Sequence, residues 1–299
     1  MPLPLHGILV CDKPRGPSSH DLVARVRRLL GTRRVGHAGT LDPAAEGVLL
    51  IAVGRATKLI ESLQAGRKEY AARLVLGQVS TSGDLEGPLL ASPEHTAPDA
   101  AEIRAALDSF RGEIEQVPPA HSAIKVAGQP LYRSARRGEV VTVPSRRVTI
   151  YGLNLLDYHY PELDIVVECS SGTYIRTLAS DLGAALGTGA YLHALVRTCV
   201  GRFGLAEAWT LDELERRLSP ASFSGMALHP DDALPERQTL LLDSAQTGAW
   251  YDGRPVRRTG TAGTAARCGS FNAGGRWLGV GALDSTADQW LPRLVVGSS

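Results

Sequence analysis

The stretch GHAGTLDPAAEG, residues 36–47, contains three glycines, one histidine and an Asp-Pro pair. It runs directly into the apolar segment VLLIAV, residues 48–53, which is typical of a buried strand or of the start of a helix. Glycine permits close backbone approach or a positive φ, and the proline after Asp42 restricts the backbone of both residues. One carboxylate therefore stands on a stiff turn before a buried segment. Asp42 either hydrogen-bonds to the backbone of its own turn or presents its carboxylate for catalysis.

Composition places the chain among ordinary soluble globular proteins. Its 299 residues are 43% apolar and 21% charged, which is enough for one large domain and a small one. No apolar run approaches the roughly 20 residues that a membrane helix requires. The N-terminus lacks the basic start and the long apolar core of a signal peptide. We therefore expect a cytoplasmic protein with no membrane segment.

Familiar cofactor and nucleophile motifs are missing from the sequence. The histidines show no HExxH-like spacing, and we find no GxxxxGK[ST], no GxSxG and no GxGxxG after a strand. The four cysteines are widely scattered without a CxxC pair, which is typical of reduced and mostly buried thiols. They are Cys11, Cys169, Cys199 and Cys268. We therefore expect no metal site.

Positive charge is clustered, although the net charge is only +1. Lysine supplies four of the 32 basic residues, and the others are arginine, whose planar fork suits phosphate and stacking on bases. Residues 22–37 hold five arginines and no acid, and residues 124–147 hold six cations against Glu139. Basic patches favour a polyanion such as RNA. The alternative is that arginine-rich usage only reflects a GC-rich genome.

Apolar periodicity and turn residues predict the secondary structure around these motifs. Residues 112–145 are rich in proline, glycine and cations, and we expect a long loop-like excursion there. From about residue 230 the chain turns into short apolar segments, which predicts a small β-rich module. The predicted elements are strands at 7–11, 69–76, 147–156 and 163–169, and helices at 21–30 (begun by Ser18-Ser19 and ended by Gly31), 98–111, 175–186 and 210–218.

Five motifs in order resemble the TruB family of tRNA pseudouridine synthases, which isomerise the T-loop uridine at position 55. They are GILVCDKPRGPSSHDLVARVRR, GHAGTLDPAAEGVLLIAVGRATK, KEYAARLVLG, HSAIKVAGQPLYRSARRGE and CSSGTYIRTLASDLG. The resemblance covers about residues 5–205. The tail is similar, more weakly, to the PUA RNA-binding module. One such motif would be weak evidence, whereas five in the right order are specific.

The resemblance implies that Asp42 is the covalent catalyst, acting as a nucleophile or as a base, and that no cofactor is needed. Tyr70 matches the tyrosine that stacks on the target base, although without this context it would read as a half-buried strand residue. Arg176 matches the arginine that pairs with the catalytic aspartate, which would keep Asp42 ionised and fix its rotamer. His37 matches a residue that fills space beside the flipped nucleotide.

Further positions are assigned by the same resemblance. Tyr174 and Leu195 match substrate-pocket residues, although Leu195 could equally be core, and Asp84 aligns with a further acid that could equally lie in a solvated loop. Segment 118–139 resembles a thumb loop that closes on the T-arm, where cations such as Lys125 and Arg133 would meet phosphates. Lys13 lies in a shared motif that would support the catalytic loop. The sequence departs from the family at residues 80–83 (STSG), where a T-D-T-like run is usual, which puts fine positioning in doubt.

We therefore expect an α+β fold with a mainly antiparallel mixed sheet in a catalytic domain, residues 1–229, whose thumb-like insertion spans about 112–145. A PUA-like domain would follow at 230–299. The expected partner is the tRNA T-arm, bound by a monomer without an obligate protein partner. Three alternatives remain: a guide-RNA-dependent synthase, a structural RNA-binding protein with a dead site, and a tRNA-folding chaperone, which could also be an accompanying role.

Overall fold

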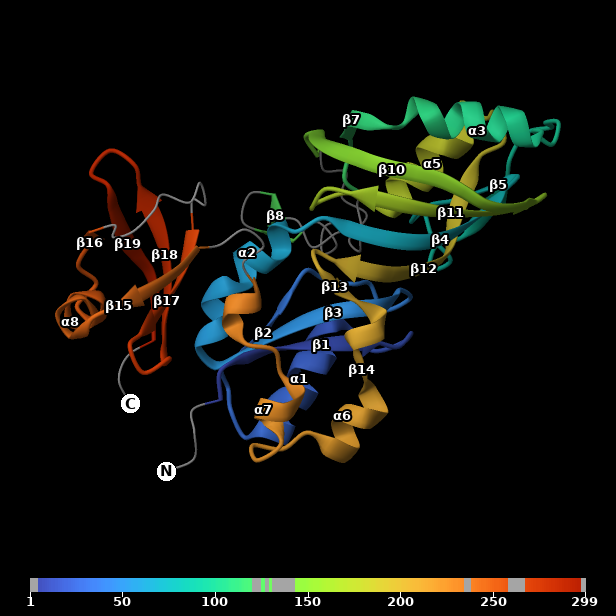
Figure 1. The fold of residues 1–299 in the computed structure, drawn as a ribbon. Coiled ribbons are helices and arrows are strands. Elements are labelled where there is room, and N and C mark those ends of the chain that lie inside the picture. Colours follow the sequence, from blue (N-terminus) through green and yellow to red (C-terminus); the bar gives the residue numbers. More distant parts are fainter. Residues whose placement is uncertain are drawn as a thin grey trace.

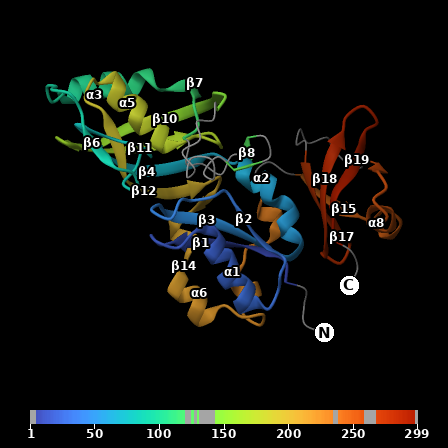
Figure 2. The same cartoon turned by 180° about the vertical axis from the view of Figure 1, so that it is seen from behind.

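The computed structural model describes residues 5–119, 125–126, 129–130, 143–233, 238–257 and 267–296. These residues form a large mixed sheet and a separate five-stranded sheet, with short helices around them (Figures 1 and 2). The large sheet contains β1 (Gly7–Lys13), β2 (Val35–Ala38), β3 (Glu46–Val53), β4 (Lys68–Leu76), β7 (Gly112–Gln116), β10 (Arg146–His159), β11 (Glu162–Cys169), β12 (Ala190–Val200), β13 (Phe203–Gly204) and β14 (Trp209–Thr210).

Helices and small hairpins complete the chain before residue 238. The two-stranded pairs are β5 (Gln78–Ser80) with β6 (Leu89–Ala91) and β8 (Lys125–Val126) with β9 (Gln129–Pro130). The helices are α1 (Ser19–Leu30), α2 (Ile60–Ala65), α3 (Ala100–Ser109), α5 (Ile175–Ala185), α6 (Leu211–Arg217) and α7 (Phe223–Met226), with 3-10 turns at Gly54–Leu59, Leu205–Glu207 and Pro230–Ala233.

The strand order of the large sheet is β14-β1-β3-β12-β4-β11-β10-β7, with β2 paired to β3 and β13 to β12. The pairs β1–β14 and β3–β12 are parallel, and the other pairs in this sheet are antiparallel. The predicted α+β fold with a mainly antiparallel mixed sheet is therefore confirmed. The parallel contact between β3 and β12 joins the two halves of the sheet.

Strands β1 and β3 are apolar on both faces because both faces are covered. Successive side chains on a strand point to opposite faces, so Leu9 and Ile51 pack against α1, whereas Ile8 and Leu50 pack on the other side. This explains the continuous apolar run at 48–53, which forms a strand rather than a helix. Helix α1 begins with the expected cap, in which Ser18 and Asp21 form a capping box, and it ends at Gly31 in the left-handed region.

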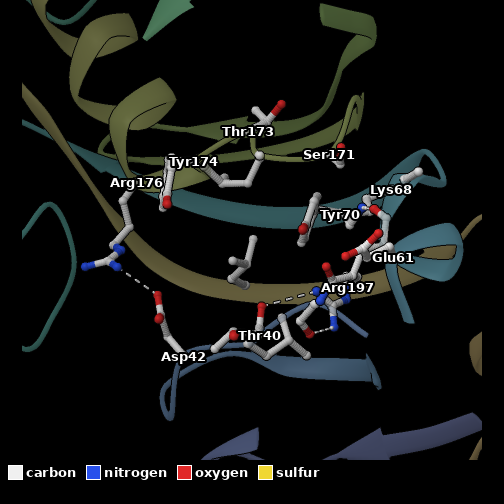
Figure 3. A pocket seen from close by; sticks show the side chains of 17 residues that line it. Thr40, Asp42, Glu61, Lys68, Tyr70, Ser171, Thr173, Tyr174, Arg176 and Arg197 are labelled. Atoms are coloured by element: carbon white, nitrogen blue, oxygen red, sulfur yellow. Dashed lines mark hydrogen bonds and ion pairs between the residues drawn. The ribbon is translucent and has the colours of Figure 1, made fainter. Parts of the chain in front are cut away.

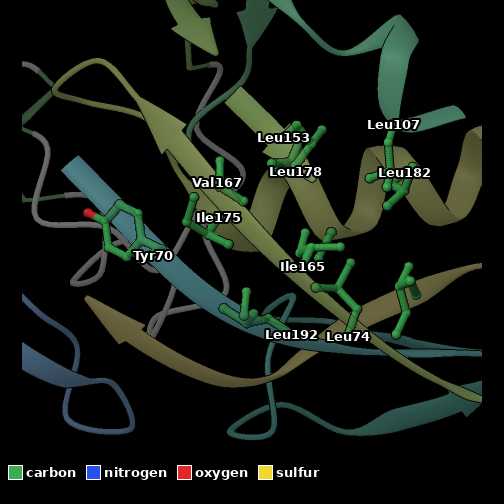
Figure 4. Packing of buried hydrophobic residues seen from close by; sticks show 14 of the residues in the cluster. Tyr70, Leu74, Leu107, Leu153, Ile165, Val167, Ile175, Leu178, Leu182 and Leu192 are labelled. Atoms are coloured by element: carbon green, nitrogen blue, oxygen red, sulfur yellow. The ribbon is translucent and has the colours of Figure 1, made fainter. Parts of the chain in front are cut away.

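The other half of the large sheet has its own core (Figure 4). Helix α5 packs on β12 and helix α3 packs on β10, and their buried leucines meet the inward faces of β4 and β11. Tyr70 lies at the edge of this core, on β4, with its hydroxyl directed away from the leucines (Figure 4). The core thus fixes the strand that carries Tyr70.

The five-stranded sheet has the order β15-β17-β18-β19-β16. Its elements are β15 (Gln238–Leu242), α8 (Ser244–Tyr251), β16 (Val256–Arg257), β17 (Arg267–Asn272), β18 (Trp277–Asp284) and β19 (Gln289–Val295). Its own core is centred on Trp250 and Trp290, both fully buried. Trp277 and Val296 belong instead to the cluster that also contains Ile8, Ala56 and Leu59, so apolar side chains of this sheet join the core on that side of the large sheet.

The structure contains several elements that the sequence analysis did not predict, among them β2, α2 and α7. Residues 112–116, expected to open the excursion, form the edge strand β7 and pair with β10, and Ile114 packs against the core that contains Leu107 of α3. Strand β12 was not predicted. The C-terminal module is β-rich, as predicted, and it also contains helix α8. Most of the expected excursion, including Arg133, lies outside the described residues, as does the side chain of Lys125.

Candidate active site

A cleft of about 580 Å³ opens where the 39–42 loop faces the start of α5 across strands β4 and β12 (Figure 3). This loop connects β2 to β3, and β3 pairs with β12 of the other half of the sheet. The glycine-rich turn therefore lies at the junction of the two halves. The cleft is lined by residues 39–42, 61, 64, 65, 68, 70, 171–176, 195 and 197. A cavity of this size is in the range of small-ligand sites.

Two carboxylates share one guanidinium at one end of this cleft. Arg176 Nη2 lies 3.0 Å from Asp42 Oδ2, and Arg176 Nη1 lies 3.2 Å from Asp84 Oδ2. The side chains of Arg176 and Asp84 are 8% and 10% exposed, whereas that of Asp42 is 45% exposed. Asp84 is itself held, because its Oδ1 accepts from the Ser82 hydroxyl and from the backbone N–H of Glu86. Asp42 is therefore the carboxylate that a ligand in the cleft can reach.

Three buried polar side chains hold the backbone on both sides of Asp42. Lys13 Nζ donates to Pro43 O at 3.3 Å and to Ala45 O at 2.6 Å. Ser19 Oγ donates to Leu41 O at 3.0 Å and accepts from Leu41 N at 2.9 Å. The third side chain, Arg197, donates to the carbonyls of residues 39 and 40. Lys13 therefore supports the loop that carries Asp42, and these hydrogen bonds preorganise the loop backbone.

Tyr70 and Lys68 lie two residues apart on β4, so both side chains face the cleft. Burial raises the pKa of the Tyr70 hydroxyl, although the nearby charge of Arg197 acts against this. Lys68 Nζ donates to Gln64 O and Gly66 O at the end of α2. Burial, and then the charge of Arg197, lowers the pKa of Lys68 to about 8. The floor of the cleft is therefore a buried tyrosine beside two buried cations.

Tyr174 and Leu195 also line the cleft, as the resemblance implied. Tyr174 is the residue before α5, and its backbone is fixed by Gln116, whose side chain accepts from Tyr174 N at 3.0 Å and donates to Tyr174 O at 3.3 Å. Arg146 lies over the Tyr174 ring, with 5.6 Å between its Cζ and the ring centroid. Leu195 packs against the main core and also faces the cleft.

His37 lies on β2 and is not among the residues that line the cleft. Its ring meets that of His20 edge-on, with centroids 5.2 Å apart. Burial, and then the charges of His20 and Arg197, lowers the pKa of His37 to about 4, so the imidazole is neutral near pH 7. Within the described residues its Nδ1 is buried without a hydrogen-bond partner.

Sequence reasoning missed several polar residues of the cleft, including the two buried cations Lys68 and Arg197. Lys68 could have been found, because it stands two positions before Tyr70, directly before the strand predicted at 69–76, and β4 begins at Lys68. Arg197 could not, because β12 was not predicted. Among the residues that the structure describes, no three His, Cys, Asp or Glu side chains gather where they could hold a metal ion.

The cysteines agree with expectation, since all four are free thiols; Cys11, Cys169 and Cys268 are buried and Cys199 is half-buried. None of the helices in the described ranges is long and apolar enough to cross a membrane.

Comparisons with known proteins agree with this architecture. Residues 27–175 match the TruB family pseudouridylate synthase (N terminal domain), and residues 176–224 match the tRNA pseudouridylate synthase B C-terminal domain. The tRNA pseudouridine synthase B of Trichormus variabilis is 43% identical over 255 residues, which cover 84% of this chain and 86% of that protein. The protein of the same name from Pseudomonas aeruginosa is 45% identical over 256 residues, covering 85% and 84%.

A solved structure shares the fold. In the crystal structure of a Cbf5-Nop10-Gar1 complex, the matched chain has a TM-score of 0.72 and 23% identity, and the match covers 99% of this chain and 84% of that one.

Proposed function

The chain belongs to the TruB family of pseudouridylate synthases, and we propose that it isomerises uridine to pseudouridine at position 55 in the T-loop of tRNA. The observation that supports this most directly is the Asp42 carboxylate, which is reachable in the cleft while Arg176 and three buried side chains hold it in one orientation. A reaction that needs one fixed carboxylate suits this arrangement.

The proposed reaction breaks the N1–C1′ glycosidic bond of the uridine, rotates the uracil and forms a C5–C1′ bond. C5 then loses its hydrogen as a proton and N1 gains one, so the product is an isomer of the substrate. Asp42 starts the reaction either by attacking as a nucleophile or by taking a proton as a base, and either role divides one difficult step into easier ones. Arg176 orients Asp42 through their ion pair.

The uracil must leave its stack to reach Asp42, because its reacting atoms are inaccessible inside a folded T-loop. We propose that it enters the cleft over Tyr70, with Tyr174 and Leu195 on its other sides. His37, outside the cleft lining, would contact the RNA beside the extruded nucleotide. Asp84 acts through Arg176 rather than on the substrate.

Other parts of the chain would bind the rest of the tRNA. We propose that the five-stranded sheet and α8 belong to a PUA-like RNA-binding domain that spans 230–299. Residues within the thumb-like insertion, including Lys125 and Arg133, would meet phosphates of the T-arm, with an affinity that falls as salt rises. We expect a monomer that acts in the cytoplasm without an obligate protein partner.

The test measures tritium release from unmodified tRNA labelled at uridine C5, because C5 loses its hydrogen only when it becomes the glycosidic carbon. Wild type is compared with Asp42→Asn, and each is also given tRNA in which uridine 55 is replaced by cytidine. We expect stoichiometric release by wild type from the unmodified tRNA, none from the substituted tRNA, and none by Asp42→Asn. Filter binding should give the same tRNA affinity for both proteins.

Each alternative has its own outcome in this experiment. Tight binding without release by wild type would refute the synthase and favour a tRNA-folding chaperone. Release that persists with the substituted tRNA would move the target away from position 55. Release by Asp42→Asn at the wild-type rate would keep the reaction and remove Asp42 from its centre.

A further inference from the structure

Arg197 occupies the opposite end of the cleft from Arg176 (Figure 3). It is 1% exposed, although it carries a permanent charge. Among the described residues, no carboxylate forms an ion pair with it. Burying a charge destabilises the fold unless its donors form hydrogen bonds. The groups that accept from this guanidinium therefore indicate its role.

The partners of Arg197 are backbone carbonyls of the catalytic loop and of the strand that follows it. Nη2 donates to Gly39 O at 3.1 Å, Nη1 to Thr40 O at 3.4 Å and Nε to Val48 O at 2.7 Å. Gly39 and Thr40 are the third and second residues before Asp42. One rigid group therefore fixes the entry to the loop and the strand that leaves it.

The sheet register places Arg197 beside Tyr70. The two residues are directly opposite in the antiparallel β4–β12 pair, so their side chains are neighbours on one face. Arg197 is also opposite Gly47 in the parallel β3–β12 pair. A Cβ on Gly47 would lie 2.3 Å from Arg197 O, so only glycine lets β12 approach the loop this closely.

We infer that Arg197 is a positioning residue for the isomerisation, and that it fixes the distance between the Asp42 carboxylate and the Tyr70 hydroxyl. This inference rests on the proposed function. The loop that carries Asp42 and the strand that carries Tyr70 are separate segments. Arg197 is a buried donor that bonds to the loop and lies opposite Tyr70 on the neighbouring strand. Arg197 also bonds to the Tyr70 hydroxyl. Because a guanidinium has donors and no acceptor, the Tyr70 hydroxyl cannot donate to it, which leaves the Tyr70 proton free to point into the cleft.

The role requires a guanidinium rather than any cation. Arginine presents five donors in a planar fork, whereas lysine has one rotating ammonium on a flexible stem. A lysine at position 197 would keep the charge but could not reach Gly39 O, Val48 O and Tyr70 together. Arg197→Lys therefore separates the geometric role of the residue from its charge.

The experiment compares single-turnover tritium release and tRNA affinity for wild type, Arg197→Lys and Arg197→Met. Arg73→Lys is the matched control, because Arg73 lies on β4 but is exposed and pairs with Asp164. We expect release to slow by about 100-fold in Arg197→Lys, as for a reacting group misplaced by about 1 Å, and by more in Arg197→Met. The tRNA dissociation constant should change less than about threefold, and Arg73→Lys should match wild type.

A second readout separates positioning from general support of the fold. Ionisation of Tyr70 is followed by ultraviolet absorbance as the pH rises, with Tyr70→Phe as the subtraction; Arg197, Cys169 and Asp42 are the titratable or charged groups that act on this hydroxyl. Since the positive charge and hydrogen bond of Arg197 lower the pKa of Tyr70, we expect that pKa to rise in Arg197→Lys and to rise further in Arg197→Met.

The outcomes separate this inference from the proposed function. No release by wild type would refute the synthase itself. Release at the wild-type rate in folded Arg197→Lys and Arg197→Met would refute the positioning role while leaving the synthase intact. Slow release with an unchanged Tyr70 titration would also refute it, as would the failure of both variants to fold, because Arg197 would then be a structural residue only.

Discussion

The two arginines at the ends of the cleft use the same side chain in different ways. Arg176 is bonded to the carboxylates of Asp42 and Asp84, whereas Arg197 is bonded to the carbonyls of Gly39, Thr40 and Val48. Both are almost fully buried. A guanidinium between carboxylates fixes the rotamer of a reactive group, whereas one among carbonyls fixes the path of the backbone that carries that group.

The two ends of the cleft also differ in how their charges are paired. At the Arg176 end, one cation faces two acids, and Asp42 remains partly open to solvent. At the other end, Lys68 and Arg197 are both buried cations that the structure pairs with backbone oxygens. Carbonyl dipoles offset the burial of charge only in part, so we expect the Arg197 end to show the greater sensitivity of stability to pH.

The largest effect should follow from breaking the Arg176 end. Arg176→Met would leave Asp42 without its partner and Asp84 buried beside it, so we expect the single-turnover rate to fall by about 1,000-fold or more. Tritium release measures this rate, and filter binding should give a nearly unchanged tRNA affinity. Asp84→Asn keeps the Asp42–Arg176 pair and should cost only about tenfold. Equal losses in the two variants would contradict the assignment of Asp42 as the reactive carboxylate.

Lys68→Met removes a buried charge at the Arg197 end of the cleft, and so tests how much that charge lowers the free energy of unfolding. The pKa of Lys68 is lowered by burial and by Arg197 to about 8 from 10.5, so the unfolded chain binds more protons between these values. The burial cost is therefore fully present below pH 8 and disappears as the pH rises toward 10.5. We expect the free energy of unfolding of wild type, relative to Lys68→Met, to rise by about 2–3 kcal/mol across this window.

Urea unfolding of Lys68→Met and wild type, in parallel at several pH values, measures this difference. Other alkaline titrations occur in both proteins and cancel. A difference that stays flat between pH 8 and 10 would mean that Lys68 keeps an ordinary pKa.

A smaller effect should follow from loosening the loop between the two arginines. Ser19 is buried and makes hydrogen bonds to both the N–H and the carbonyl of Leu41. Ser19→Ala leaves these groups without this partner. We expect the free energy of unfolding to fall by about 1–3 kcal/mol and tritium release to slow. Ser109→Ala, at an exposed serine that donates to Ala106 O, is the control and should change neither quantity. Wild-type behaviour of Ser19→Ala would show that the two cations hold the loop without it.

The smallest effect should be an acid-dependent one at His37. Burial lowers the pKa of His37 to about 4 from 6.5, so the stability that depends on its neutral form is present above pH 6.5 and is lost as the pH falls toward 4. His37→Gln should therefore lose less stability than wild type between pH 6.5 and 4, by about 1 kcal/mol after allowance for solvent screening. Thermal unfolding at several pH values measures this, with the exposed His159→Gln as the control. Parallel curves for wild type and His37→Gln would contradict the lowered pKa.

Local signals in the sequence determined most of the individual elements. Ser18, Asp21 and Gly31 predict both ends of α1, because caps act within a few residues of the chain. The GHAGTLDP turn, the strand around Tyr70 and the helix of Arg176 follow from equally local patterns. The order of these motifs also supports the family resemblance from which Asp42, Tyr70 and Arg176 were predicted as site residues.

Only the tertiary structure decided how β12 and its arginine complete the cleft. Register shifts between Leu192 and Ala194 and between Arg197 and Cys199 interrupt the two-residue alternation from which a strand is predicted. The bonds from Arg197 to Gly39 and Thr40 span 158 and 157 residues, and no local pattern specifies such a contact. The sequence determined which chemical groups the chain carries and where its turns lie. Long-range strand pairing decided which buried cations meet which carbonyls, because that depends on a register visible only in the assembled sheet.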